Sequence, residues 1–160
     1  MPKNSLKESQ IGNGDLEMNT VGPLGKEQII RSFLEGVFGT SLRKQKLVVG
    51  QDSNKKPQIH EFDLVSNDMR IVGEIKSGRR SRANYLGALS DCLFLTKLKA
   101  KKKLLVLTNN EFYQYFKTNS EGIISPAIDV MLLHPEELVT NRPELANARF
   151  SKTLDRRQNE

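Results

Sequence analysis

Residues 60–78 read HEFDLVSNDMRIVGEIKSG, and this stretch determines how the middle of the chain is expected to fold. Two apolar runs of strand length flank Asn67 and Asp68, which are residue types that favour tight turns. The pattern predicts strands at 59–66 and 69–77, joined as an antiparallel hairpin. The hairpin also gathers acidic residues, which is unusual in a chain of net charge +6.

The expected two-residue turn predicts the register of this hairpin. It places Asp63 opposite Val72 and Glu61 opposite Glu74. Directly opposed residues share a face of the sheet, and faces alternate along each strand. One face is therefore predicted to carry Glu61, Asp63, Val65, Val72, Glu74 and Lys76. The other face is predicted to be core and carries Phe62, Leu64, Ile71, Gly73 and Ile75.

A divalent cation would compensate for the repulsion between these acidic side chains. In the predicted register Asp63 and Glu74 are diagonal neighbours, roughly 7–8 Å apart at the backbone, so that their carboxylates can converge on one ion. Such oxygen ligands suit Mg²⁺, with Mn²⁺ able to substitute, and Glu61 is a further candidate ligand. Lys76 could orient or help to deprotonate an attacking water. In the alternative interpretation, the acids merely occupy the exposed face of a hairpin.

The flanking segments predict an α/β fold with a central mixed β-sheet flanked by helices. In chain order, the expected elements are a helix at 26–39, strands at 43–50, 59–66 and 69–77, a helix at 82–100 capped by Ser81, a buried strand at 104–108, a short helix at 111–116 and a strand at 128–133. On the first helix, Glu27 precedes Ile30 by three residues and Leu34 by seven, which places it on the inward-facing stripe.

The chain is expected to hold one domain at 22–140, between a flexible arm at 1–21 and a polar tail at 141–160. It has no apolar run of the ~20 residues that span a bilayer and no secretory signal, so we expect a cytoplasmic protein without membrane contact. The single cysteine, Cys92, lies among leucines and is predicted to be buried. The two histidines, His60 and His134, are expected to be structural.

The pattern resembles the PD-(D/E)XK nuclease superfamily over roughly residues 22–109. The resemblance rests on Asp63, ten intervening residues and the triplet Glu74, Ile75 and Lys76. It implies a restriction-endonuclease-like core of order αβββαβ. It also implies that Asp63 and Glu74 bind Mg²⁺ with the backbone carbonyl of Ile75, that Lys76 serves the nucleophilic water, and that Glu27 completes the site. The chain departs from the family pattern at Phe62, where proline commonly precedes the first acid.

Basic residues follow the triplet directly. Arg79, Arg80 and Arg82 are expected to contact phosphates at the mouth of the site, or else to be ordinary loop charges. The lysine-rich run at 97–103 is interpreted as a solvated surface. The resemblance implies a metal-dependent nuclease, most simply a DNA rather than RNA endonuclease of restriction or repair type, with the helix at 82–98 as a candidate homodimer interface. The alternative is a catalytically silent module that binds nucleic acid or a protein partner.

Overall fold

The computed structural model describes residues 23–147 of the chain, and the expected arm at 1–21 lies outside them. In chain order, the elements are helix α2 (Pro23–Phe38), strands β1 (Leu42–Gln51), β2 (Pro57–Ser66) and β3 (Ile71–Lys76), helix α3 (Arg82–Thr96), strand β4 (Lys102–Leu107), helix α4 (Asn110–Ser120), strand β5 (Ile128–Leu132), helix α5 (Pro135–Asn141) and the 3-10 helix η1 (Pro143–Asn147). The order helix, three strands, helix, strand is the one predicted from the sequence.

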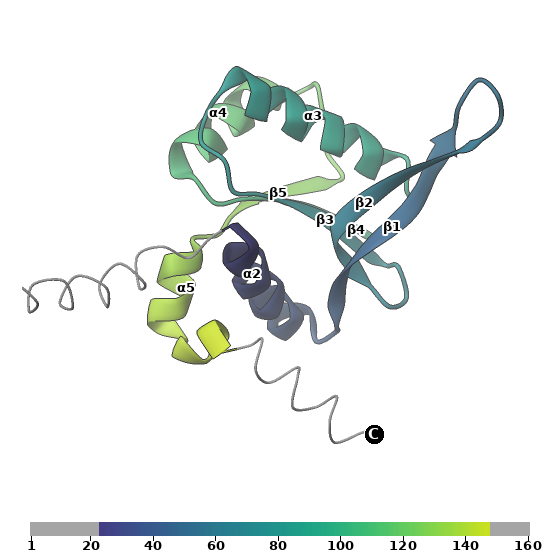
Figure 1. Cartoon of the computed structure of the whole chain (residues 1–160). Coiled ribbons are helices and arrows are strands. Elements are labelled where there is room, and N and C mark those ends of the chain that lie inside the picture. Colours follow the sequence, from purple (N-terminus) through teal and green to yellow (C-terminus); the bar gives the residue numbers. More distant parts are fainter. Residues whose placement is uncertain (1–22, 148–160) are drawn as a thin grey trace, which may run out of the picture.

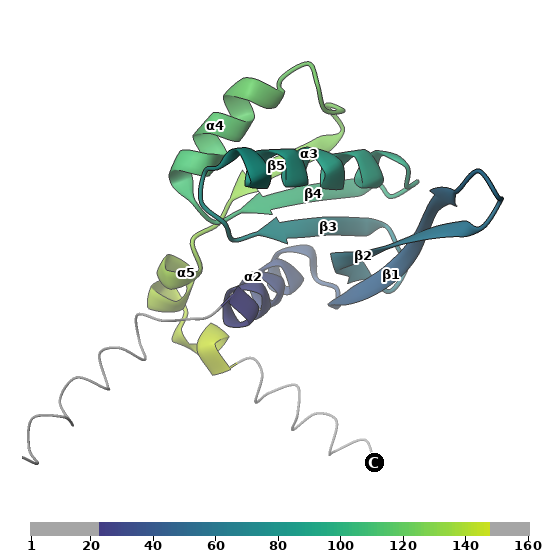
Figure 2. The same cartoon turned by 45° about the horizontal axis from the view of Figure 1, so that its top comes forward.

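These strands form one mixed five-stranded sheet in the order β1-β2-β3-β4-β5 (Figure 2). Strands β1, β2 and β3 are joined antiparallel, whereas β3, β4 and β5 run parallel. The parallel part requires a helical crossover between consecutive strands, which α3 and α4 supply. Strand β4 is the apolar segment expected to be buried on both faces, and its residues 104–107 are indeed buried.

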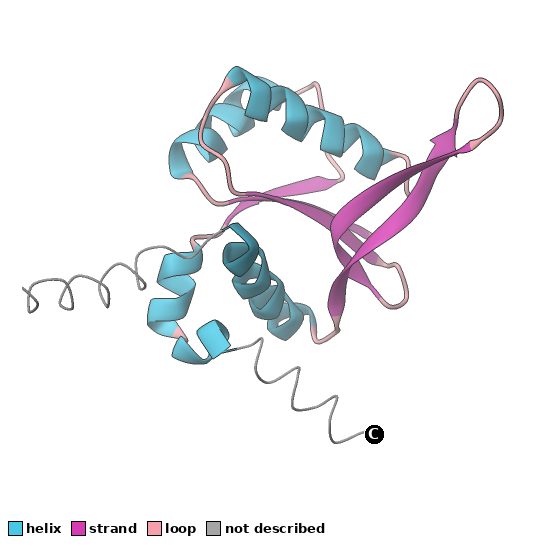
Figure 3. Ribbon diagram, in the orientation of Figure 1, coloured by secondary structure: helices cyan, strands magenta, loops and turns pink. Residues whose placement is uncertain are grey.

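Helices cover both faces of the sheet, which makes the fold an α/β sandwich (Figures 1 and 3). Helices α3 and α4 lie on one face, while α2 and α5 lie on the other. The first core includes Phe62, Val65, Val72, Ala88, Cys92, Leu95, Phe112 and Phe116. The second core includes Ile30, Leu34, Leu42, Leu64, Ile71, Ile75, Leu104 and Val106. The expected α/β class is confirmed, and so is the burial of Cys92.

Two parts of the fold go beyond the expectations. The packed region continues past residue 140, because η1 inserts Leu145 into the protein, where it is only 8% exposed. In addition, α3 is buried on one side only, since Leu86 and Leu93 are 52% and 59% exposed. The homodimer expected through this helix remains a prediction. Among residues 23–147, no helix combines the length and apolar character needed to cross a membrane.

Candidate metal and catalytic site

The β2–β3 hairpin has a different register from the one predicted. Its paired residues are Leu64 with Gly73 and Val65 with Val72. Continued by one pair, this register sets Asp63, rather than Glu61, level with Glu74. The prediction that Glu61 opposes Glu74 and that Asp63 opposes Val72 is therefore wrong. The change brings the two acids of the motif closer together than the diagonal arrangement expected from the sequence.

The turn explains the change of register, because it contains four residues, 67–70, instead of two. The Ser66 carbonyl accepts a hydrogen bond from the Met69 amide at 3.0 Å, and Met69 adopts the left-handed conformation with φ of 59°. The Ser66 hydroxyl donates to Asp68 at 2.8 Å and accepts from the Ile71 amide at 3.0 Å. These bonds stabilise the longer turn. Because the loop still contains an even number of residues, each residue of β3 faces the side of the sheet that was predicted relative to Val65.

An irregularity in β2 overturns part of the predicted face assignment. Arg43 pairs with Val65, whereas Gln45 pairs with Phe62, so two residues of β2 oppose the single residue Lys44 of β1. Such a bulge reverses the alternation of side chains along the strand. Phe62 therefore packs with Val65 on the α3 side, while Leu64 packs on the α2 side. The prediction that Phe62 and Leu64 share a face is wrong. Glu61 is exposed and pairs across the strands with Lys46.

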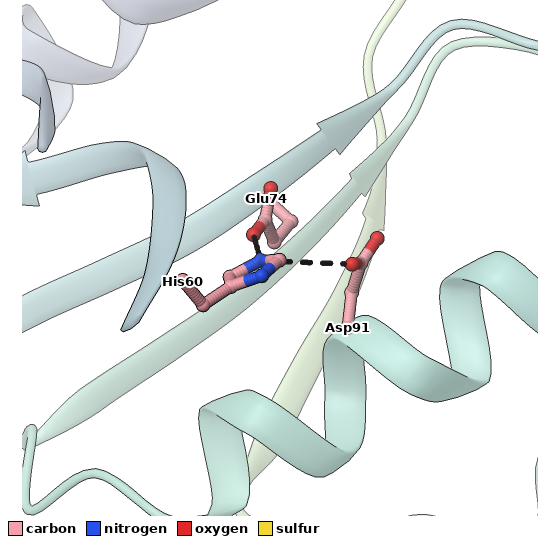
Figure 4. Close-up of side chains that lie close together, drawn as sticks. All are labelled: His60, Glu74 and Asp91. Atoms are coloured by element: carbon pink, nitrogen blue, oxygen red, sulfur yellow. Dashed lines mark hydrogen bonds and ion pairs between the residues drawn. The ribbon is translucent and has the colours of Figure 1, made fainter. Parts of the chain in front are cut away.

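The bulge brings His60 onto the α3 side of the sheet, beside Glu74 and Asp91 (Figure 4). The Nε2 atom of His60 lies 2.6 Å from Glu74 Oε1 and 3.8 Å from Asp91 Oδ1. The imidazole stacks on Phe94, with ring centroids 4.4 Å apart, and meets the Phe62 ring edge to face. His60 is thus packed against aromatic rings, and it also contacts an acid of the motif; its expected structural role stays a prediction.

Lys76, the last residue of β3, forms an ion pair with Asp91 of α3. Its Nζ atom lies 2.5 Å from Asp91 Oδ2. Burial is the largest single influence on the pKa of Lys76 and acts to lower it, but the ion pair with Asp91 and the other nearby acids together raise that pKa. The lysine is therefore a cation at neutral pH.

Asp63 and Glu27 form the other side of the site, and Lys44 connects them. Lys44 Nζ lies 3.3 Å from Glu27 Oε2 and 3.7 Å from Asp63 Oδ1. Asp63 Oδ2 accepts a hydrogen bond from the Ile75 amide at 2.9 Å, and the Asp63 carbonyl accepts from Arg31 of α2 at 3.1 Å. The expected inward position of Glu27 is consistent with its side chain being only 20% exposed. Ile75 is buried, and its carbonyl as a metal ligand stays a prediction.

Glu74 has the most strongly perturbed pKa of the cluster. Burial, followed by the nearby carboxylates of Asp63 and Asp91, raises the pKa of Glu74 to about 10, while Lys76 acts in the opposite direction. Its side chain is only 5% exposed. Glu74 is therefore protonated at neutral pH, and its Oε1 atom makes a 2.6 Å contact with His60 Nε2. A cation that replaced this proton would be surrounded by carboxylates.

The arginines follow Lys76 closely: Arg79 and Arg80 lie in the loop before α3, and Arg82 is the first residue of that helix. Ser81 caps this helix, as predicted, by accepting a hydrogen bond from the Asn84 amide at 3.0 Å. Arg79, Arg80 and Arg82 are exposed. Arg80 lies 3.5 Å from Glu111 and its guanidinium stacks 4.2 Å from the centre of the Tyr115 ring. The lysine-rich run lies at the opposite end of β3, where Lys102 pairs with Ile71.

Sequence reasoning did not find Asp91 and assigned no chemistry to His60. Asp91 had one available signal, because it is the only acidic residue of α3 and it lies on the side of that helix that is rich in apolar residues; it is 6% exposed. A lone acid on a buried helix face requires a partner. His60 had no comparable signal, since its side of the sheet depends on the bulge in β2.

Comparisons of the chain with protein-family models, with curated proteins and with solved structures found no match. The functional interpretation therefore rests on the geometry of this site.

Proposed function

We propose that the protein is a metal-dependent nuclease of the PD-(D/E)XK type, with a restriction-endonuclease-like core. One observation carries the proposal: Asp63, Glu74 and Lys76, the residues of the sequence motif, converge where β2 and β3 meet. A buried acid beside two other carboxylates destabilises the folded protein unless a proton or cation compensates. Strongly perturbed carboxyl groups of this kind are typical of functional sites.

The donor set fits a hard divalent cation such as Mg²⁺. Asp63 and Glu74 would hold it through carboxylate oxygens, together with the backbone carbonyl of Ile75. When bound, the ion would supply charge stabilisation at the phosphate and lower the pKa of a water. Asp63 is oriented for this role, because the Ile75 amide and Lys44 already fix its two oxygens.

Lys76 and Glu27 have supporting roles in this proposal. The raised pKa of Lys76 keeps an ammonium beside the carboxylates, where it can orient the attacking water and stabilise negative charge at phosphorus. Glu27 is connected to Asp63 through Lys44, so it can adjust the position of that acid. Glu61 is exposed, which makes it the weakest of the candidate ligands.

Nucleic acid, with DNA preferred over RNA, is the proposed substrate. A surface hollow of about 600 Å³ lies next to Arg80 and Arg82 and is also lined by Tyr85 and Tyr115. Arginines suit phosphates, and tyrosine rings suit unstacked bases. The net charge of +6 favours a polyanionic partner. A single, buried cysteine is compatible with the proposed cytoplasmic location.

A catalytically silent binding module is the second candidate, and one observation favours it. The acids of the site already have partners within the described residues: Lys44 for Asp63, His60 for Glu74 and Lys76 for Asp91. A site that is compensated internally can persist without an ion. Only an assay of activity separates the two candidates.

The deciding experiment incubates the purified protein with linear, single-stranded and branched DNA and with RNA, in Mg²⁺, Mn²⁺ or EDTA. We expect cation-dependent cleavage that is lost in Asp63→Asn and Glu74→Gln, and that falls by roughly 10²–10⁴-fold in Lys76→Ala. The control is Asp129→Asn, which removes an exposed acid from β5 and should leave cleavage unchanged. Cleavage that persists in EDTA would contradict the metal mechanism. Absence of cleavage with retained binding would favour the silent module.

A further inference from the structure

We propose that His60, Glu74 and Asp91 form a second metal site, which binds a divalent transition-metal ion such as Mn²⁺ through one imidazole nitrogen and two carboxylates. The proposed Mg²⁺ site uses Asp63 and Glu74, so Glu74 would be shared between the two. The inference concerns metal binding and does not require that the protein cleaves nucleic acid.

The geometry of the three side chains suits one ion. Their ligand atoms all lie within 4.8 Å of one another. They come from three different elements, β2, β3 and α3, which the sheet and the core beneath α3 hold together (Figure 4). The side chains of Glu74 and Asp91 are 5% and 9% exposed, so few water molecules can compete with an ion for these carboxylates. Three protein ligands that leave further positions open are common in catalytic metal sites.

Asp91 provides a second, independent observation. Its Oδ2 atom is buried and pairs with the Lys76 ammonium 2.5 Å away, whereas its Oδ1 atom lies 3.8 Å from His60 Nε2, which is beyond hydrogen-bond distance. Buried carboxylate oxygens in folded proteins are nearly always hydrogen-bonded or bound to a metal. The Oδ1 atom of Asp91 can therefore accept a cation on the side of His60 and Glu74.

The imidazole determines which ion the cluster prefers. The ring of His60 is held between Phe62 and Phe94, which directs Nε2 towards Glu74. Imidazole nitrogen binds Mn²⁺, Co²⁺ and Zn²⁺ better than it binds Mg²⁺, which prefers oxygen ligands. The cluster should therefore discriminate between Mn²⁺ and Mg²⁺, whereas a site of oxygen ligands alone discriminates much less.

Binding at this cluster would also change the partner of Lys76. An ion held by Asp91 competes with the ammonium group for the same carboxylate, because Lys76 contacts Asp91 directly. Lys76 would then be released from α3. The Asp91–Lys76 ion pair thus couples occupancy of the second site to the availability of the lysine.

Electron paramagnetic resonance of bound Mn²⁺ tests the proposal, because coupling to an imidazole nitrogen is observed only when histidine is a ligand. We expect this coupling in the parent protein and in the control His134→Gln, which alters the only other histidine, at the start of α5. In His60→Gln the coupling should disappear, and Mn²⁺ affinity measured by calorimetry should fall roughly tenfold or more. Absence of coupling in the parent, or coupling that survives in His60→Gln, overturns the proposal.

Two further variants keep the result decisive. Asp91→Asn preserves the shape of the side chain, so it tests the site even if His60→Gln fails to fold, and it should also weaken nitrogen-coordinated Mn²⁺ at least tenfold. Unchanged Mn²⁺ affinity in Asp91→Asn contradicts the proposal. Asp63→Asn should keep the nitrogen coupling while it removes cation-dependent cleavage. Coupling in a parent that cleaves nothing would retain the second site and reject the nuclease, so the two failures are distinguishable.

Discussion

At the scale of single residues, Glu74 connects the two halves of the site. It contacts His60 on the α3 side and lies level with Asp63 across the hairpin. Burial favours its protonated form, and the neighbouring carboxylates strengthen that preference. The stability of the protein should therefore depend on pH through this one side chain, in the direction opposite to that of an ordinary ion-paired acid.

We predict that stability in EDTA falls as the pH rises from about 5 to 9. The pKa of Glu74 is raised from an ordinary 4.5 to about 10, so the folded state retains a proton that the unfolded state has lost. The free energy of unfolding decreases with pH wherever the folded state binds more protons. The glutamine of the variant Glu74→Gln cannot ionise, so the stability of this variant should depend less on pH. At pH 8 the variant should melt at the same or a higher temperature than the parent.

Thermal melts across this pH range, with Glu61→Gln as the exposed-acid control, check the prediction. Added Mn²⁺ should reverse the order at pH 8, because an ion that binds only the folded parent stabilises it and the variant has lost a ligand. If Glu74→Gln melts below the parent in EDTA at every pH, and Mn²⁺ shifts both proteins equally, then Glu74 is a purely structural acid.

At the scale of elements, the approach of β3 to β4 depends on Gly73. A Cβ atom at this position would lie 2.9 Å from both the Cβ and the carbonyl oxygen of Leu104, and 3.2 Å from Leu64. The strands on both sides of β3 leave no room for a methyl group. Gly73 also immediately precedes Glu74, so its small size affects the position of the site.

We predict that Gly73→Ala destabilises the protein by about 1–3 kcal/mol, because overpacking forces the backbone apart. The control is Gly87→Ala in the middle of α3, where a Cβ would meet nothing within 4 Å. That variant should be more stable than the parent by about 0.5–1 kcal/mol, as alanine favours helix. Urea denaturation measures both. Equal stability of the two variants would show that β3 can move away from β4.

The start of α3 presents its arginines next to the last residue of β3. We predict that the triple variant Arg79→Ala, Arg80→Ala and Arg82→Ala weakens nucleic-acid binding for all sequences alike. It should also reduce the slope of log affinity against log salt by about 0.7–0.9 for each phosphate that the variant no longer neutralises. Arg80 should contribute least, since Glu111 and Tyr115 already bind it.

Lysines at the far end of α3 provide a control with the same change of charge. Lys97, Lys99 and Lys101 are exposed, and their replacement by alanine should change the salt slope less than the arginine variant does. Fluorescence anisotropy over a series of salt concentrations makes the comparison. Equal effects of the two triple variants would indicate that only net charge matters.

At the scale of the whole molecule, the exposed side of α3 is the expected contact between two copies. Leu86 and Leu93 are seven residues apart, so they lie on one face of the helix, and both are more than half exposed. We predict that the protein is a dimer by light scattering and that Leu86→Gln with Leu93→Gln makes it a monomer. Ile123→Gln, which alters an apolar residue that is 66% exposed, is the control. A monomeric parent would contradict the prediction.

The sequence by itself determined the architecture and half of the site. The patterns that define the elements act over short distances along the chain. They are the apolar alternation of the strands, the buried run at 104–107 and the helical stripe of α2. The α/β order and the cap at Ser81 could therefore be predicted from the sequence. The spacing of Asp63, Glu74 and Lys76 was equally visible. Their approach required only that the two runs form a hairpin with an even loop.

The tertiary structure alone decided the register of the hairpin and the partners of its acids. The four-residue turn depends on Ser66 and Asp68 bonding to nearby amides, and the bulge opposite Lys44 has no glycine or proline to mark it. That bulge reverses which side of the sheet each residue faces, so His60 reaches Glu74. Asp91 joins them because α3 packs on that face. Contacts between separate elements depend on packing, and periodicity along one strand cannot determine them.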